Sequence, residues 1–147
     1  MAKGLAEQRR QEMIAALRAG GHRLTPQRLA VVEILAESAN HPSVEQVFKR
    51  VQRDFPTTSL ATIYKTMSLL KQMGQVLELG FAHWGSRYDG KKPYPHPHVI
   101  CTRCGAIVDP ESPGMQELAQ QMAGKSGFRI SHHRLDFFGL CPRCQGR

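Results

Sequence analysis

The chain has 147 residues, which is enough for one ordinary domain or two small ones. It carries 20 lysines and arginines against 12 aspartates and glutamates, so its formal charge of +8 suits a polyanionic partner. The sequence has no apolar run of membrane-spanning length, and its N-terminus lacks the hydrophobic segment of a signal peptide. We therefore expect a soluble, cytoplasmic protein without a membrane partner.

The first two helices are predicted from apolar spacing and from residues that begin or end helices. Gly20-Gly21 ends the first helix. Thr25 is a good N-cap and Pro26 suits the first position of the second helix, which we expect to close at His41-Pro42. The expected buried faces are Met13, Ile14 and Leu17 in the first helix and Leu29, Val32 and Leu35 in the second.

Two further helices are predicted before residue 75. Ser43 and Gln46 have the spacing of a capping box, and Phe55-Pro56 stops the third helix. The fourth starts near Ser59 and ends at Gly74. Its expected buried residues are Leu60, Ile63, Met67 and Leu70.

The remaining surface of the fourth helix is suited to a DNA groove. Residues 56–75 contain no acidic side chain to repel phosphate. Lys65 can contact phosphate, while Thr62 and Tyr64 can contact base edges. The alternative is an ordinary solvated helix face, and the residues of this helix alone do not decide between the two.

A hairpin is predicted after the four helices. Residues 75–81 alternate apolar and other side chains, and residues 86–89 look like the returning strand. Helices followed by a hairpin make a winged helix-turn-helix, with the fourth helix as reader and the hairpin as wing. We therefore expect a DNA-binding domain over residues 1–84 and a hinge over residues 85–95.

A smaller unit is expected over residues 96–147. Its strands are predicted near residues 98–101, 106–109 and 133–140. Ser112-Pro113 is expected to cap a helix with one apolar face, made of Met115, Leu118, Ala119 and Met122. So small a unit needs further stabilisation from zinc and from a partner subunit. A two-fold homodimer would also place two reading helices on a palindromic site.

All four cysteines fall in two C-x-x-C pairs, Cys101 with Cys104 and Cys141 with Cys144. Two such pairs can surround one Zn²⁺ with four thiolates. Two disulfides or a redox pair are the alternatives, and a cytoplasmic location disfavours disulfides. The spacing therefore predicts a structural zinc site that ties the end of the chain to its middle.

His96 and His98 are separated by one residue beside a predicted strand. Side chains two residues apart on a strand point to the same face, so both rings could reach one ion. The alternative is a pair of loop histidines beside prolines. If this is a second metal site, its other ligands come from elsewhere in the chain.

Several motifs together resemble the ferric uptake regulator family of metal-dependent bacterial repressors. The resemblance covers nearly the whole chain. It is carried by Arg23-Leu24-Thr25-Pro26-Gln27-Arg28, His41-Pro42, Ala61-Thr62-Ile63-Tyr64-Lys65, His96-x-His98-x-x-Cys101-x-x-Cys104-Gly105 and His132-His133-Arg134-Leu135-Asp136-Phe137-Phe138-Gly139.

The resemblance implies an α+β protein in which a winged-helix domain is joined to an α/β dimerisation domain. It implies that a double-stranded DNA operator is bound through Arg23, Ser59, Ala61, Thr62, Tyr64 and Lys65. It also implies a regulatory site for Fe²⁺ or Mn²⁺, with Zn²⁺ as a further candidate. Its implied ligands are His41, Asp89, His96, His98 and Asp109.

Asp109 makes the chain resemble the peroxide-sensing branch of the family, whose members usually have aspartate at this position. Iron-sensing members usually have glutamate there. In that branch the bound Fe²⁺ reacts with peroxide, a ligand histidine is oxidised, and DNA is released. The matching residues here are His41 and His96. Pro95 and Pro97 replace ligands of an accessory site found in iron-sensing members, although His133 stands where that site takes a histidine.

Three other functions remain as alternatives. The nearest is an iron- or zinc-responsive repressor of metal uptake genes. A zinc hydrolase with His96 and His98 as ligands and Asp89 as general base would instead show turnover. A zinc-binding adaptor would show neither turnover nor DNA binding.

Overall fold

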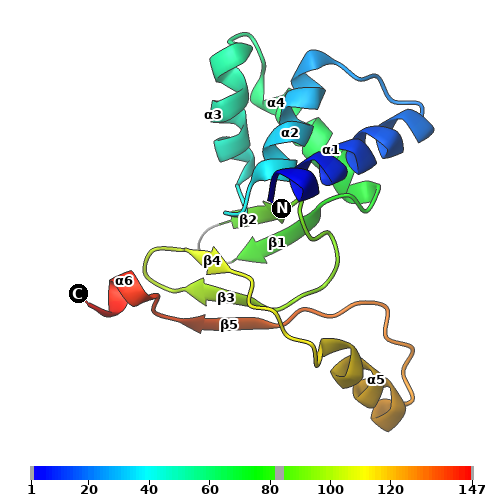
Figure 1. Cartoon of the computed structure of the whole chain (residues 1–147), viewed down its shortest axis with the longest axis vertical. Coiled ribbons are helices and arrows are strands. Elements are labelled where there is room, and N and C mark those ends of the chain that lie inside the picture. Colours follow the sequence, from blue (N-terminus) through cyan, green and yellow to red (C-terminus); the bar gives the residue numbers. More distant parts are fainter. Residues whose placement is uncertain (1, 82–84, 147) are drawn as a thin grey trace. The chain divides into compact units, whose positions relative to one another are not determined.

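The computed structural model describes the backbone of residues 2–81 and 85–146 (Figure 1). It divides the chain into two compact units, Met1–Pro93 and Tyr94–Arg147, here called the helical unit and the sheet unit. Helices and a hairpin in the first and a small sheet in the second confirm the predicted α+β architecture. None of the described helices is both long and apolar enough to cross a membrane.

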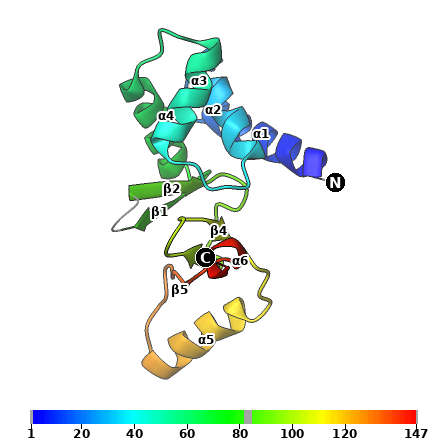
Figure 2. The same cartoon turned by 90° about the vertical axis from the view of Figure 1, so that its left-hand side faces the viewer.

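The helical unit packs four helices around one apolar core. Figure 2 shows these helices on one side of the hairpin that follows them. The helices are α1 (Ala2–Ala19), α2 (Pro26–Glu37), α3 (Val44–Asp54) and α4 (Leu60–Gln72). The largest fully buried side chains of the core include Met13, Leu17, Leu35, Ile63, Met67 and Leu70.

Side-chain caps begin α2 and α3 where the sequence predicts them. The hydroxyl of Thr25 accepts the N–H of Arg28 at 3.2 Å. Ser43 and Gln46 form both hydrogen bonds of a capping box, at 3.2 and 2.9 Å. These bonds satisfy N–H groups that have no partner inside the helix.

One boundary and one buried position in the helical unit differ from the prediction. Helix α2 ends at Glu37, well before His41-Pro42, because Ser38 already has an extended backbone. Leu60 is 37% exposed, because residues 59–62 at the start of α4 all face solvent and the buried face begins at Ile63. Helical spacing assigns a residue to a face, but it does not show how far the core extends along that face.

The hairpin is formed by the antiparallel strands β1 (Leu77–Phe81) and β2 (Gly85–Asp89). The predicted domain end at residue 84 lies outside the described residues, and β2 belongs to the helical unit. Gly90 follows β2 directly and is buried against α2. A Cβ atom there would lie 2.8 Å from the Leu35 backbone oxygen, so only glycine fits without displacing α2.

The sheet unit contains β3 (His98–Cys101), β4 (Ile107–Val108) and β5 (Asp136–Gly139) in the order β4-β3-β5. The pairing of β3 with β4 is antiparallel, and that with β5 is parallel. Strand β5 therefore forms one edge of the sheet. The long connection from β4 to β5 contains α5 (Met115–Ser126).

Helix α5 differs from its prediction in how it begins. Its N-cap is Gly114, which makes no side-chain hydrogen bond, and not the predicted Ser112-Pro113. A capping hydroxyl must stand directly before the first helical residue, and Ser112 lies too early in the chain. No residue of α5 is buried, and its predicted apolar residues Met115, Leu118, Ala119 and Met122 line one surface pocket.

Candidate metal centre

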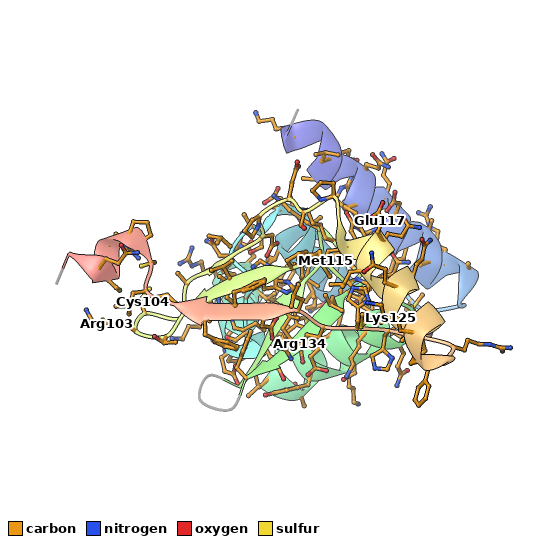
Figure 3. The ribbon with its side chains drawn as sticks, turned by 90° about the horizontal axis from the view of Figure 1, so that it is seen from below. Arg103, Cys104, Met115, Glu117, Lys125 and Arg134 are labelled. Carbon is orange, nitrogen blue, oxygen red and sulfur yellow. The ribbon has the colours of Figure 1, made fainter. Side chains whose placement is uncertain are left out.

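The four cysteines come together at one end of the sheet unit. Their sulfur atoms all lie within 4.8 Å of one another, and all four are free thiols. The Sγ atoms of Cys104 and Cys141 are 3.7 Å apart. Figure 3 shows Cys104 and Arg103 at the end of β5, beside α6 (Pro142–Gln145).

Two tight turns hold the sulfur atoms in place. Gly105 has a φ of 75°, and its N–H returns to the carbonyl of Cys101 at 3.0 Å. In the second turn the N–H of Cys144 binds the carbonyl of Cys141, also at 3.0 Å. Arg103 joins the two turns by donating to the Cys144 carbonyl at 2.8 Å. The short helix α6, which builds the second turn, was not predicted from the sequence.

The backbone around the sulfur atoms favours thiolates at two positions. N–H groups of Cys104 and Cys141 hydrogen-bond to Cys101 and lower the pKa of its thiol to about 5. The pKa of Cys141 is also lowered, by the N–H of Cys144. The neighbouring Cys141 sulfur raises the pKa of Cys144 to about 12. Because adjacent thiolates repel each other, this group of atoms can become fully deprotonated only around a cation.

A histidine and a carboxylate meet in the helical unit. His41 Nε2 lies 3.1 Å from Asp89 Oδ2, and both side chains are buried. The other oxygen, Asp89 Oδ1, accepts the N–H groups of Lys91 at 3.0 Å and Lys92 at 2.9 Å. The carboxylate is therefore held by the backbone on one side and turned toward the imidazole on the other.

Two histidines and a carboxylate meet in the sheet unit. The rings of His96 and His98 lie side by side, with centroids 4.3 Å apart. The Nε2 atoms of His96 and His98 lie 3.4 and 3.7 Å from the two oxygens of Asp109. His98 begins β3 and Asp109 directly follows β4, so the antiparallel pairing brings them together. Imidazole and carboxylate are ligands that Fe²⁺, Mn²⁺ and Zn²⁺ accept.

The comparison with known proteins fits this ligand chemistry. Residues 19–138 match the model of the ferric uptake regulator family. The chain belongs to that family. Its relatives include the peroxide-responsive repressor PerR of Staphylococcus aureus, which is 37% identical over 137 residues, 93% of this chain and 92% of the relative.

Solved structures of the ferric uptake regulator family share the fold. The Campylobacter jejuni peroxide stress regulator is 30% identical with a TM-score of 0.71, over 81% of this chain and 89% of that one. The Helicobacter pylori ferric uptake regulator Fur has a TM-score of 0.80 at 24% identity, over 95% of this chain and 93% of that one. The second likeness concerns the fold alone.

The expected DNA-contacting residues lie on the surface of the helical unit. All six are exposed: Arg23, Ser59, Ala61, Thr62, Tyr64 and Lys65. Arg23 lies in the loop before α2, and the other five gather at the start of α4. The Tyr64 hydroxyl donates to Glu45 at 3.2 Å, and this bond raises the pKa of the phenol. One end of a helix thus presents hydroxyl groups and a lysine to solvent.

Sequence reasoning missed one residue beside the paired histidines. Asp136 on β5 is the register partner of His98, and its Oδ1 lies 3.6 Å from His98 Nδ1. Its other oxygen accepts a hydrogen bond from Arg134 Nε at 2.6 Å. The only signal in the sequence was its place within the motif at residues 132–139.

The chain offers few ligands for the accessory metal site of iron-sensing relatives. His133 Nε2 is buried and has no hydrogen-bond partner among the described residues. Pro95 and Pro97, which stand at two of that site's positions, offer no ligand atom.

Proposed function

We propose that this protein is a metal-dependent transcriptional repressor that binds a double-stranded DNA operator as a homodimer. The observation that carries the proposal is the composition of two ligand sets, the buried pair His41 and Asp89, and the buried His98 with the partly buried His96 and Asp109. Two ligands or three do not complete the coordination sphere that Fe²⁺ or Mn²⁺ prefers. We propose that one regulatory ion takes ligands from both sets.

A Zn²⁺ ion at the four cysteines has a separate, structural role in this proposal. The clustered free thiols, two of them with lowered pKa values, support a closed four-sulfur site. Such a site leaves no open position for catalysis. Its function is to join the turn after β3 to the end of the chain.

DNA recognition is assigned to the exposed start of α4. Lys65 supplies positive charge for phosphate, while Thr62 and Tyr64 supply polar contacts to bases. A dimer formed at the β5 edge of the sheet would present two such helices to a palindromic operator. An ion held by both units couples metal binding to the conformation that fits the operator.

The proposed signal is peroxide. Asp109 and the likeness to the Staphylococcus aureus repressor support this branch over an iron- or zinc-responsive one. An Fe²⁺ ion held by these ligands would supply the redox chemistry that cleaves the O–O bond of peroxide, with one oxygen atom entering a ligand ring and the other leaving as water. We assign His41 and His96 as the rings that gain this oxygen atom, after which an oxidised ring would bind the ion less tightly.

Metal-dependent DNA binding is the first test of this function. Duplexes selected from a random pool are titrated with zinc-loaded protein, with and without Mn²⁺, and binding is followed by fluorescence anisotropy. We expect tight binding only with Mn²⁺, and several-fold weaker binding for Lys65→Ala. Lys125→Ala, which removes a lysine from α5, is the control and should bind as the unaltered protein does. DNA binding that ignores Mn²⁺, or no DNA binding at all, would overturn the proposal.

A further inference from the structure

The backbone of His41 has an uncommon conformation. Within residues 2–81 and 85–146 it is the one non-glycine residue with a positive φ, at 50°. Residues with a Cβ atom rarely adopt this left-handed region, and they remain there only where surrounding contacts hold them. The contacts that hold His41 therefore bear on where its imidazole lies.

Those contacts come from β2, and mainly from Arg87. Its Nε donates to the carbonyl of His41, and its Nη2 donates to the carbonyl of Asn40 at 2.7 Å. The next residue of the strand, Tyr88, donates its N–H to the carbonyl of Pro42 at 3.0 Å. Three consecutive carbonyls of the loop are thus bound by two consecutive residues of one strand.

The same strand also carries the acidic ligand. Asp89 lies two residues beyond Arg87, and side chains at this spacing share one face of a strand. Strand β2 therefore holds Asp89 directly and holds His41 through its backbone. The 3.1 Å approach of His41 Nε2 to Asp89 Oδ2 is the result.

Arg87 cannot itself be a ligand, because a guanidinium carries a permanent positive charge and offers no acceptor. Its charge alone would oppose a nearby cation. Loss of that charge would then tighten metal binding, whereas loss of a positioning contact would weaken it. The two effects have opposite signs, so they can be told apart by experiment.

We propose that Arg87 is a positioning residue for the regulatory metal site: by binding the carbonyls of Asn40 and His41, it holds the His41 ring in place to meet an ion together with Asp89. This inference rests on the proposed function, because it needs a second metal site besides the four cysteines. It assigns a part in metal binding to Arg87, a residue that itself contacts neither the ion nor DNA.

The test is a Mn²⁺ titration of zinc-loaded protein. We expect Arg87→Gln to weaken Mn²⁺ binding about tenfold, which is the usual scale for residues that orient metal ligands. Arg87→Lys keeps the charge but lacks a planar fork for two carbonyls. Its Mn²⁺ affinity should therefore fall between those of the unaltered protein and Arg87→Gln. Arg28→Gln is the matched control, since Arg28 donates to the Arg23 carbonyl at 2.7 Å elsewhere in the helical unit. It should leave Mn²⁺ affinity unchanged.

Zinc content and the thermal unfolding midpoint of each variant show whether it is folded. If Arg87→Gln fails to fold, Arg87→Lys decides by the same titration. Unchanged or tighter Mn²⁺ binding in a folded Arg87 variant overturns the inference and leaves the proposed function intact. Failure of the unaltered protein to bind Mn²⁺ overturns both.

Discussion

The two units of the chain are stabilised in different ways. In the helical unit, α2, α3 and α4 all contribute buried residues to one core. In the sheet unit α5 buries none, and Phe137 and Phe138 on the edge strand β5 are 53% and 59% exposed. The helical unit has a core of its own, whereas the sheet unit needs support from outside its own side chains.

This difference suits the roles proposed for the two units, which are DNA reading by the helical unit and dimerisation by the sheet unit. A reading helix has to present the same surface to DNA whenever the protein binds, so it belongs on a unit with a packed core. The sheet unit can depend on bound zinc and a second subunit. Zinc binding and the contact between subunits can each be removed by a separate substitution, so the two contributions to stability can be measured one at a time.

The largest effect is expected from Cys104→Ser. Structural zinc contributes on the order of 10 kcal/mol to the folding of small domains, which is comparable with the whole stability of a unit this size. We expect the variant to lose its zinc and the sheet unit to unfold while the helical unit stays folded. Zinc analysis and limited proteolysis with fragment mapping measure both. Thr102→Ser, in the same turn, serves as the control, and a zinc-free sheet unit that resists protease would contradict the expectation.

The next effect compares two leucines. Leu70→Ala should lower the free energy of unfolding of the helical unit by about 2–5 kcal/mol, because Leu70 is fully buried. Leu118→Ala, on α5, should lower that of the sheet unit by less than about 1 kcal/mol, because Leu118 is 44% exposed. Urea unfolding followed separately in each unit gives both values. Equal losses would mean that α5 is packed as tightly as α4.

A smaller effect is expected at the edge of the sheet. Phe138→Glu places a charge in the proposed dimer contact and should weaken dimerisation by about 2 kcal/mol or more, close to thirtyfold. Sedimentation velocity over a range of concentrations measures the change. Phe128→Glu changes another exposed ring, which lies outside β5, and should leave the dimer intact. If both variants dimerise like the unaltered protein, the contact lies elsewhere.

The smallest effect belongs to the capping box. Ser43→Ala should destabilise the helical unit by about 1 kcal/mol, because the N–H of Gln46 loses its acceptor. Urea denaturation measures this change. Ser68→Ala, on the exposed side of α4, is the control, and an equal loss there would show that the cap contributes nothing specific.

Features set by neighbouring residues could be predicted from the sequence. The caps at Thr25 and Ser43 and the cysteine pairs all depend on spacings of two or three residues. Features that depend on packing could not. Leu60 fits an apolar helical pattern, yet no local signal shows that its side chain lies beyond the edge of the core.

The candidate metal site shows the same limit. His96 and His98 stand out because they are close in the sequence, but His41 and Asp89 were identified only through the family motifs. Arg87 and Asp136 were missed because their contacts depend on how strands and loops are aligned, which no short motif determines.

The most direct test of the account is the response of DNA binding to peroxide. The zinc-loaded protein is loaded with Fe²⁺ or Mn²⁺ without oxygen and exposed to a small amount of peroxide. Operator binding and the masses of peptides containing His41 and His96 are then measured. We predict that the Fe²⁺ form alone releases DNA and gains one oxygen atom on one of these histidines. If the Fe²⁺ form stays bound and unmodified while a chelator releases it, the protein senses metal level and the peroxide account is wrong.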